Sequence, residues 1–206
     1  MTLATVHALI PLSLLEAMRL QDVPQPDGLD EYHVELTTKR LGMSHTVEKQ
    51  IARYDELAVR EARVPRDEVL ALFRLAERRP DADLLFADAG RRAGRRAAER
   101  VGGLRLAVHR SLPGRAGRWY GWRLAARSLG DILDVELTAD REGFAAETGE
   151  PVTHGVSSEG TACAFLGSAI AAVLRAYTDF AGAVVHERCR ARGADRCRWV
   201  AAATGG

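Results

Sequence analysis

With 206 residues and 47% hydrophobic content, the chain is long enough to bury a core and too apolar to be intrinsically disordered. A formal net charge of +1 gives no general attraction to nucleic acid or to an anionic membrane, so no direct nucleic-acid partner is expected. The N-terminal segment lacks the basic start of an export signal, and no uncharged apolar run reaches the roughly 18 residues of a membrane span. We therefore expect a cytoplasmic protein, in which disulfides are not maintained.

The N-terminal third is expected to be mainly helical. Hydrophobic periodicity predicts helices over residues 6–20 and 44–62, with a half-buried strand over residues 32–38 between them. A further helix is expected to begin at Pro65, a residue favoured at the first helical position, and to end before Pro80.

The next helix, expected over residues 81–101, has two contrasting sides. Small residues on one side would let another helix approach closely: Gly90, Ala93, Gly94, Ala97 and Ala98. Arginines occupy the other side: Arg91, Arg92, Arg95, Arg96 and Arg100. A solvated face paired with Asp88 and Glu99 is the favoured interpretation, and an anion or nucleic-acid site is the alternative.

The middle of the chain concentrates several of its large aromatic side chains. A strand is expected over residues 104–110, followed by a short helix over residues 118–130 that carries Trp119, Tyr120 and Trp122. Aromatic side chains of this kind usually belong to a core and otherwise form the wall of a ligand pocket. Two more strands, over residues 132–140 and 143–153, are expected to follow, joined by a turn.

The last third combines a helix with a hairpin. A helix over residues 161–180 is predicted by one continuous apolar stripe, formed by Cys163, Leu166, Ile170, Leu174 and Tyr177. Strands over residues 183–190 and 196–202 then flank a turn that contains Gly193, which suits a positive φ. Cys189 and Cys197 fall near the base of this hairpin, where residues on paired strands approach to within about 5.5 Å.

The three cysteines of the chain cannot all pair with one another, so a disulfide framework is excluded. Three thiols with a nitrogen or oxygen ligand are what a tetrahedral zinc site requires, and Cys163, Cys189 and Cys197 would supply three of the ligands. In a regular strand Glu187 shares a face with Cys189, whereas His186 points the other way unless a bulge intervenes. Independent buried cysteines that pack as small hydrophobes remain the alternative to a metal site.

The run TACAFLGSAIAAVLRAYTDFAGAVVHERCRARGADRCRW, residues 161–199, resembles the signature of the vinyl-4-reductase-like domain. This domain recurs in bacteriochlorophyll-pathway proteins and in the sensory domains of phenol- and toluene-responsive transcription activators, and a related fold occurs in TRAPP vesicle-tethering subunits. The residues that match the signature are Cys163, Cys189, Gly193, Cys197 and Trp199. His186 stands where the family usually has Glu, and because histidine is an equally good zinc ligand we favour it and keep Glu187 as the alternative.

The resemblance implies an α+β fold in which a small antiparallel sheet packs against several helices and a C-terminal hairpin is clamped by structural zinc. On this basis residues 65–206 would form the ligand-binding domain and residues 1–64 an N-terminal helical extension. A homodimer is expected from the small-residue side of the 81–101 helix and from the dimers usual among relatives, and any output would pass through a protein partner or through self-association.

The same resemblance implies a sensor or carrier that binds a hydrophobic or aromatic small molecule. The first candidates for its pocket, chosen on composition and position, are His109, Trp119, Tyr120, Trp122 and Tyr177. Two other functions stay open: a tetrapyrrole-pathway factor or vinyl reductase component, and an assembly protein of the tethering type. Catalysis is not favoured, because a structural zinc site with four protein ligands leaves no position for water. The chain has no G-x-G-x-x-G or P-loop motif, so a reductase would need a separate subunit to supply the reductant, and a thiol enzyme using Cys163 with a histidine would lose that thiol to zinc.

Overall fold

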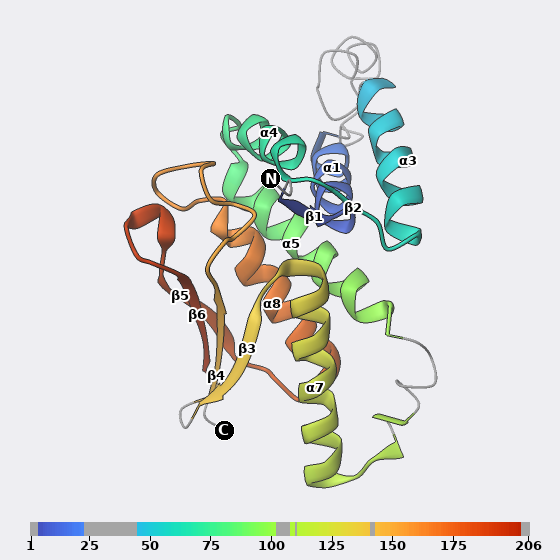
Figure 1. Cartoon of the computed structure of the whole chain (residues 1–206), viewed down its shortest axis with the longest axis vertical. Helices are drawn as coiled ribbons and strands as arrows, with labels where there is room; N and C mark the ends of the chain where they lie inside the picture. Colours follow the sequence, from blue (N-terminus) through green and yellow to red (C-terminus); the bar gives the residue numbers. More distant parts are fainter. Residues whose placement is uncertain (1–3, 23–44, 102–107, 110, 141–142, 203–206) are drawn as a thin grey trace, which may run out of the picture.

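The computed structural model describes residues 4–22, 45–101, 108–109, 111–140 and 143–202 (Figure 1). In these ranges α-helices accompany two antiparallel sheets, which confirms the expected α+β class. The α-helices are α1 (Leu9–Asp22), α3 (His45–Val59), α4 (Arg66–Glu77), α5 (Ala82–Glu99), α7 (Gly114–Leu133) and α8 (Cys163–Tyr177). The strands are β1 (Thr5–His7), β2 (Arg63–Pro65), β3 (Glu136–Asp140), β4 (Gly143–Thr148), β5 (Ala183–Arg188) and β6 (Cys197–Ala202). None of the helices described is both long and apolar enough to cross a membrane.

The close contact between α5 and α8 forms the centre of the fold (Figure 1). A Cβ atom on Gly90 would lie 2.0 Å from the carbonyl oxygen of Phe165, and one on Gly94 would lie 2.5 Å from that of Ala169. Glycine is therefore required at both positions for the two backbones to come this close. The small-residue side of α5 is filled by α8 of the same chain, so it offers no surface to a second copy. The small-residue side of α5 therefore no longer supports the expected homodimer, which stays a prediction.

The apolar stripe predicted on the last long helix is buried as expected. Along α8 the side chains of the stripe are at most 4% exposed: Cys163, Leu166, Ile170, Leu174 and Tyr177. The helix ends earlier than predicted, at Tyr177, because Thr178 has an extended backbone with φ −132° and ψ 163°. This early end frees Thr178 and the residues after it to lead the chain towards the sheet.

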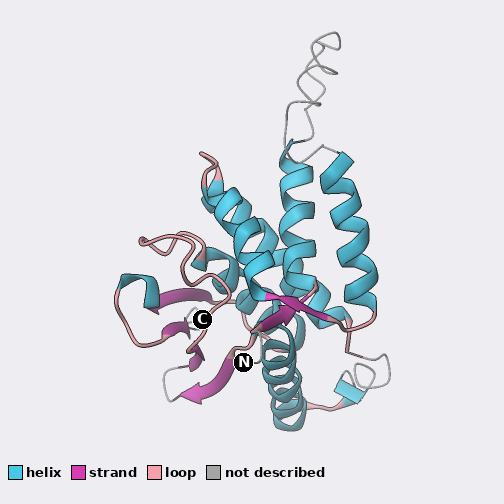
Figure 2. Ribbon diagram, turned by 45° about the horizontal axis from the view of Figure 1, so that its top comes forward, coloured by secondary structure: helices cyan, strands magenta, loops and turns pink. Residues whose placement is uncertain are grey.

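The larger sheet has the strand order β3-β4-β6-β5, with all neighbouring strands antiparallel. Figure 2 shows these strands gathered beside the helices. The strand β6 lies between β4 and β5 and carries Trp199, which faces α8, where a Cβ on Gly167 would lie 3.3 Å from the indole nitrogen. The sheet is thereby fixed against α8, with α7 next to β3.

The N-terminal elements share the core of the rest of the chain. Strands β1 and β2 form a small sheet in which Val6 faces Val64, and the predicted domain boundary between residues 64 and 65 falls inside β2. Most of α1 is buried, and its apolar side chains belong to the same cluster as those of α5 and α8. The N-terminal segment therefore packs as part of the fold that carries the cysteine hairpin.

The arginines of α5 are largely paired within the chain. Arg92 bonds Asp88 at 2.7 Å, as the spacing predicts, while Arg96 reaches Glu16 of α1 at 2.7 Å. Arg100 forms an ion pair of 2.9 Å with Glu61, just beyond α3. This side of α5 ties the helix to the N-terminal elements, which leaves the alternative of an anion or nucleic-acid site without support.

Several predicted elements have different limits in the structure. The helix expected over residues 118–130 is longer, from Gly114 to Leu133, and it contains the first residues assigned to the next strand. That helix ends at Asp134, whose left-handed backbone with φ 53° starts the turn into β3. The strand expected over residues 104–110 is wrong at Val108 and His109, which are helical, while its other residues lie outside the described ranges. The strand expected over residues 32–38 also lies outside them.

Candidate metal centre

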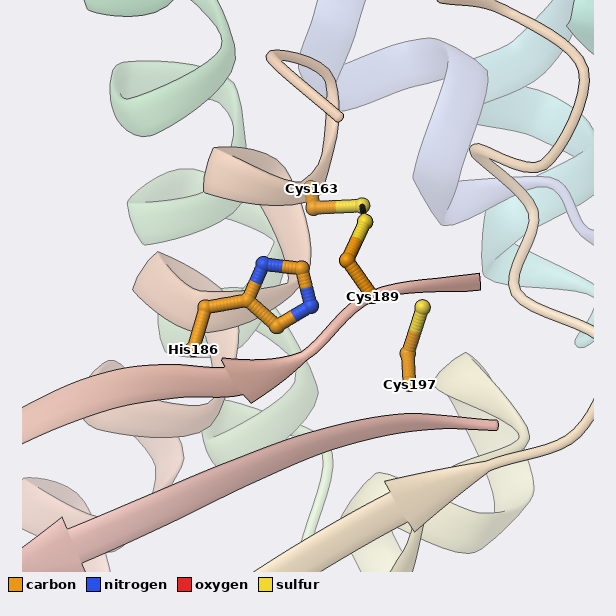
Figure 3. A group of neighbouring side chains, drawn as sticks. All are labelled: Cys163, His186, Cys189 and Cys197. Carbon is orange, nitrogen blue, oxygen red and sulfur yellow. Dashed lines mark hydrogen bonds between the residues drawn. The ribbon is translucent and has the colours of Figure 1, made fainter. Parts of the chain in front are cut away.

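Three buried thiols and one imidazole meet where α8 begins beside the hairpin (Figure 3). Cys163 is the first residue of α8, and Cys197 is the first residue of β6. His186 lies in β5, and Cys189 follows that strand directly. One ligand atom from each residue lies within 4.8 Å of all the others, so the four side chains could bind a metal ion.

Three thiols and an imidazole are donors that a tetrahedral zinc ion accepts, and the spacing of two of the sulfurs suits such an ion. Two sulfurs that are each about 2.3 Å from a tetrahedral zinc ion lie about 3.8 Å apart. The Sγ atoms of Cys163 and Cys189 are 3.9 Å apart. Nε2 of His186 is buried and has no hydrogen-bond partner among the described residues, which is costly unless another group fills that role. A cleft of about 420 Å³ borders Cys163 and His186 and gives an ion a path to the site.

A bulge in β5 decides which of the two candidate ligands faces the thiols. His186 pairs with Trp199, but the next pair is Arg188 with Arg198, so Glu187 is an extra residue in β5. The bulge turns His186 to the side of the cysteines, as Figure 3 shows. The carboxylate of Glu187 lies 2.8 Å from Nε of Arg198, and its side chain is 49% exposed. The structure therefore brings His186, and not Glu187, into the cluster.

The thiols differ in their readiness to lose a proton. The pKa of Cys163 is raised, first by its hydrogen bond to Cys197 and then by burial. The same hydrogen bond lowers the pKa of Cys197 to about 4, and His186 and the backbone N–H of Arg190 act in the same direction. Within this pair, ionisation of Cys197 is therefore favoured over ionisation of Cys163. A buried thiolate among further sulfur donors is a soft anionic site, which suits a thiophilic metal cation.

Two residues that the sequence reasoning missed support the cluster. Gly160 has a φ of +80°, and a Cβ atom there would lie 2.7 Å from Sγ of Cys189. Its carbonyl oxygen also accepts a hydrogen bond from the backbone N–H of Cys163. Thr153 lies with Oγ1 3.6 Å from Sγ of Cys163. A glycine three residues before a helix-opening cysteine is a signal that could have identified Gly160, whereas nothing in the sequence pattern marks Thr153.

Two of the predicted ligand residues line an apolar groove at the opposite end of α8. The groove has a volume of about 470 Å³ and is lined by the aromatic side chains of Trp119, Trp122, Phe144 and Phe180. The rings of Trp122 and Phe144 have centroids 4.4 Å apart, and Trp119 is 59% exposed at the rim. Phe144 and Phe180 were not predicted, because only the folded chain brings β4 and the connection from α8 to β5 beside Trp119 and Trp122.

The other three predicted ligand residues lie elsewhere. His109 and Tyr177 line a second cleft of about 410 Å³, and Tyr120 lies beside it with its ring centroid 6.3 Å from that of His109. The hydroxyl of Tyr177 is turned away, donating a hydrogen bond to the carbonyl of Ala98. The five residues thus do not form one aromatic wall: two line the groove, two line the second cleft, and Tyr120 lines neither.

Comparison of the chain with protein-family models, with curated proteins and with solved structures gives no match. The resemblance of residues 161–199 to the vinyl-4-reductase-like signature therefore rests on the sequence motif alone.

Proposed function

We propose that the chain is a small-molecule-binding module, a sensor or carrier, whose C-terminal hairpin is held by structural zinc. The observation that carries the proposal is the groove of about 470 Å³ with its four aromatic side chains. Its volume lies within the roughly 300–1,000 Å³ typical of ligand pockets, and apolar and aromatic linings are usual in such pockets. A hydrophobic or aromatic small molecule is the occupant that suits this lining.

A structural zinc ion suits the four-residue cluster better than a catalytic one. Cys163, His186, Cys189 and Cys197 would hold it, and four protein ligands complete a tetrahedral shell without a position for water. Zinc bound in this way supplies folding free energy to the elements that it joins. The role of this site is therefore structural, and the proposal includes no catalytic step at the metal.

The metal centre and the groove lie at the two ends of the same pair of elements. The centre joins the start of α8 to the turn end of the hairpin. The groove is lined by Thr178, Asp179, Phe180 and Ala181, which connect the end of α8 to the start of β5. Fixing α8 against the hairpin at one end restricts this connection at the other. Loss of zinc should for this reason also weaken ligand binding.

Calorimetric titration of the zinc-loaded protein with 2-naphthol tests the proposal. We expect saturable binding that is lost in Trp122→Ala, because Trp122 packs within the groove against Phe144. Leu84→Ala is a matched control, since Leu84 is 70% exposed on α5 and does not line the groove. Absence of saturable binding for 2-naphthol, indole and phenol would overturn the proposal. A visible absorption band from a co-purified pigment would instead favour the tetrapyrrole-pathway alternative.

A further inference from the structure

The apolar groove continues into the second cleft, which is polar. Arg118, Thr178 and Asp179 line both, so the two form one bipartite site with an aromatic half and a polar half. The polar half adds His109 and Arg175. A site of this shape would hold a molecule with an aromatic body and a polar group at one end.

The charges of the polar half favour an anion. Two guanidinium groups, those of Arg118 and Arg175, line it against the single carboxylate of Asp179. Arg175 donates a hydrogen bond of 3.4 Å to the carbonyl of Gly182, and no carboxylate in the described ranges forms an ion pair with either arginine. Within the described ranges, neither guanidinium group is therefore held in an ion pair, and both can face an occupant of the cleft.

His109 adds a hydrogen-bonding group to the polar half. Its Nδ1 atom is buried and makes no hydrogen bond to any residue that the structure describes. Burying a polar atom without a partner is unfavourable, so an occupant whose polar group reaches the imidazole is favoured over a hydrocarbon. The imidazole reaches the edge of α7, where its Cε1 would lie 2.8 Å from a Cβ on Gly121. Glycine at this position lets the histidine pack against the helix beside the cleft.

We propose that the bipartite site binds an aromatic carboxylate, with the ring system in the groove against Trp119, Trp122 and Phe144 and the carboxylate towards Arg118, Arg175 and His109. This inference rests on the proposed function and narrows its ligand from aromatic molecules in general to aromatic acids. A guanidinium group pairs with a carboxylate through two parallel hydrogen bonds, which makes arginine well suited to this recognition. The ring of Trp119 is itself held by Arg123, whose guanidinium carbon lies 4.9 Å from the ring centroid.

A matched pair of ligands tests the charge requirement. 2-Naphthoate and 2-naphthamide share the same ring system and differ in charge at one end. In low salt, we expect the zinc-loaded protein to bind 2-naphthoate at least about tenfold more tightly than 2-naphthamide. This preference for the acid should shrink as salt is added. Arg175→Gln and Arg118→Gln should each reduce the preference, while Arg95→Gln, an exposed arginine of α5 outside both clefts, should leave it unchanged. Both cleft arginines are exposed, so folding of the variants is expected to be retained and is checked by circular dichroism.

The outcomes separate the two proposals. If neither compound binds, the proposed small-molecule function fails together with this inference. If both bind with similar affinity, or the amide binds more tightly, the proposed function stands and the preference for an acid is overturned. An acid preference that survives in both Arg175→Gln and Arg118→Gln would also overturn the inference, because the charge recognition would then come from another part of the chain.

Discussion

His186 and Trp199 face each other across β5 and β6, with their rings stacked at a centroid distance of 4.7 Å and an interplanar angle of 10°. Trp199 is 1% exposed and packs on α8 at Gly167, so its indole gives the imidazole a fixed support. The bulge at Glu187 sets the side to which His186 points, and the stacking sets the plane of its ring. Trp199, the aromatic residue two positions after Cys197, thereby positions the candidate metal ligand His186 without belonging to the cluster itself.

Trp199→Ala should therefore weaken metal binding as well as the fold. Removing a buried tryptophan costs about 3–5 kcal/mol of unfolding free energy, and the imidazole loses its stacking partner. Trp199→Phe keeps an aromatic ring and should retain most of the metal affinity. Competition with a chromogenic chelator measures the affinity, and thermal unfolding measures the stability. Trp119→Ala is the control, and equal metal affinity in Trp199→Ala and Trp119→Ala would contradict the positioning role.

The ligand set is tested by metal content and stability. Structural zinc sites contribute on the order of 10–16 kcal/mol in model peptides, against roughly 5–15 kcal/mol for the stability of a whole domain. Chelation, Cys163→Ser, Cys189→Ser or Cys197→Ser should each cause insolubility or a large fall in melting temperature. His186→Ala should lose metal, whereas Glu187→Ala should keep it, because Glu187 pairs with Arg198. Elemental analysis with well under one metal ion per chain, and freely titratable thiols in the native protein, would refute the site.

Gly160→Ala should damage the metal centre although it replaces none of the four candidate ligand residues. The added Cβ would meet Sγ of Cys189 at 2.7 Å, and alanine disfavours a φ of +80°. A loss of about 1–3 kcal/mol in unfolding free energy is expected, with weaker metal binding. Gly149→Ala is the matched control, because no atom lies within 4 Å of its added Cβ. Equal stability of the two variants in urea unfolding would show that glycine is not required at position 160.

The contact between α5 and α8 gives a second glycine test, independent of the metal. Gly90→Ala would bring a Cβ to 2.0 Å from the carbonyl oxygen of Phe165 and should cost about 1–3 kcal/mol or more. Gly130→Ala in α7 has its nearest contact at 4.0 Å and should be neutral or stabilising by up to about 1 kcal/mol. Denaturant unfolding of both variants measures the difference. If Gly90→Ala left the free energy of unfolding unchanged, α5 and α8 could move apart without loss of stability.

Stability should fall in mild acid because of His7. Burial lowers the pKa of His7 below its ordinary value of 6.5, opposed by the hydrogen bond to Glu61, and Arg100 lowers it further. Nδ1 accepts a hydrogen bond of 3.1 Å from the backbone N–H of Leu9, so the folded state holds the neutral imidazole. Between the folded pKa and about 6.5 the unfolded state binds more protons, and the free energy of unfolding therefore decreases as the pH falls through this window.

Denaturant unfolding between about pH 5 and about pH 8, on either side of the ordinary histidine pKa, tests this expectation. His7→Gln should flatten the part of the pH dependence that His7 causes, and the contribution of the metal ligands should remain. His45→Gln, with an exposed side chain, should retain the full dependence of the original protein. An unchanged profile in His7→Gln would assign the acid sensitivity to other groups.

Sequence patterns predicted what is local and missed what depends on register. The stripe on α8 and the cysteine hairpin follow from periodicity and spacing within 40 or so residues, a range over which such patterns are informative. The choice of His186 over Glu187 depended on a bulge of one residue, which periodicity cannot reveal. The groove needs Phe144 beside Trp122, and that contact exists only after distant strands and helices have packed. The strand expected at His109 failed because an alternating apolar pattern over a few residues does not exclude a helix.

The position of β6 between β4 and β5 also fixes the timing of assembly during synthesis. Until residues 197–202 have left the ribosome, β4 and β5 each expose an unpaired edge, and Cys163 and Cys189 lack the third thiol. The inner sheet and the metal centre therefore become complete in the same step. A nascent chain halted before Cys197 would present open strand edges on β4 and β5, which are templates for aggregation, and would lack one of the four side chains that could bind a metal ion.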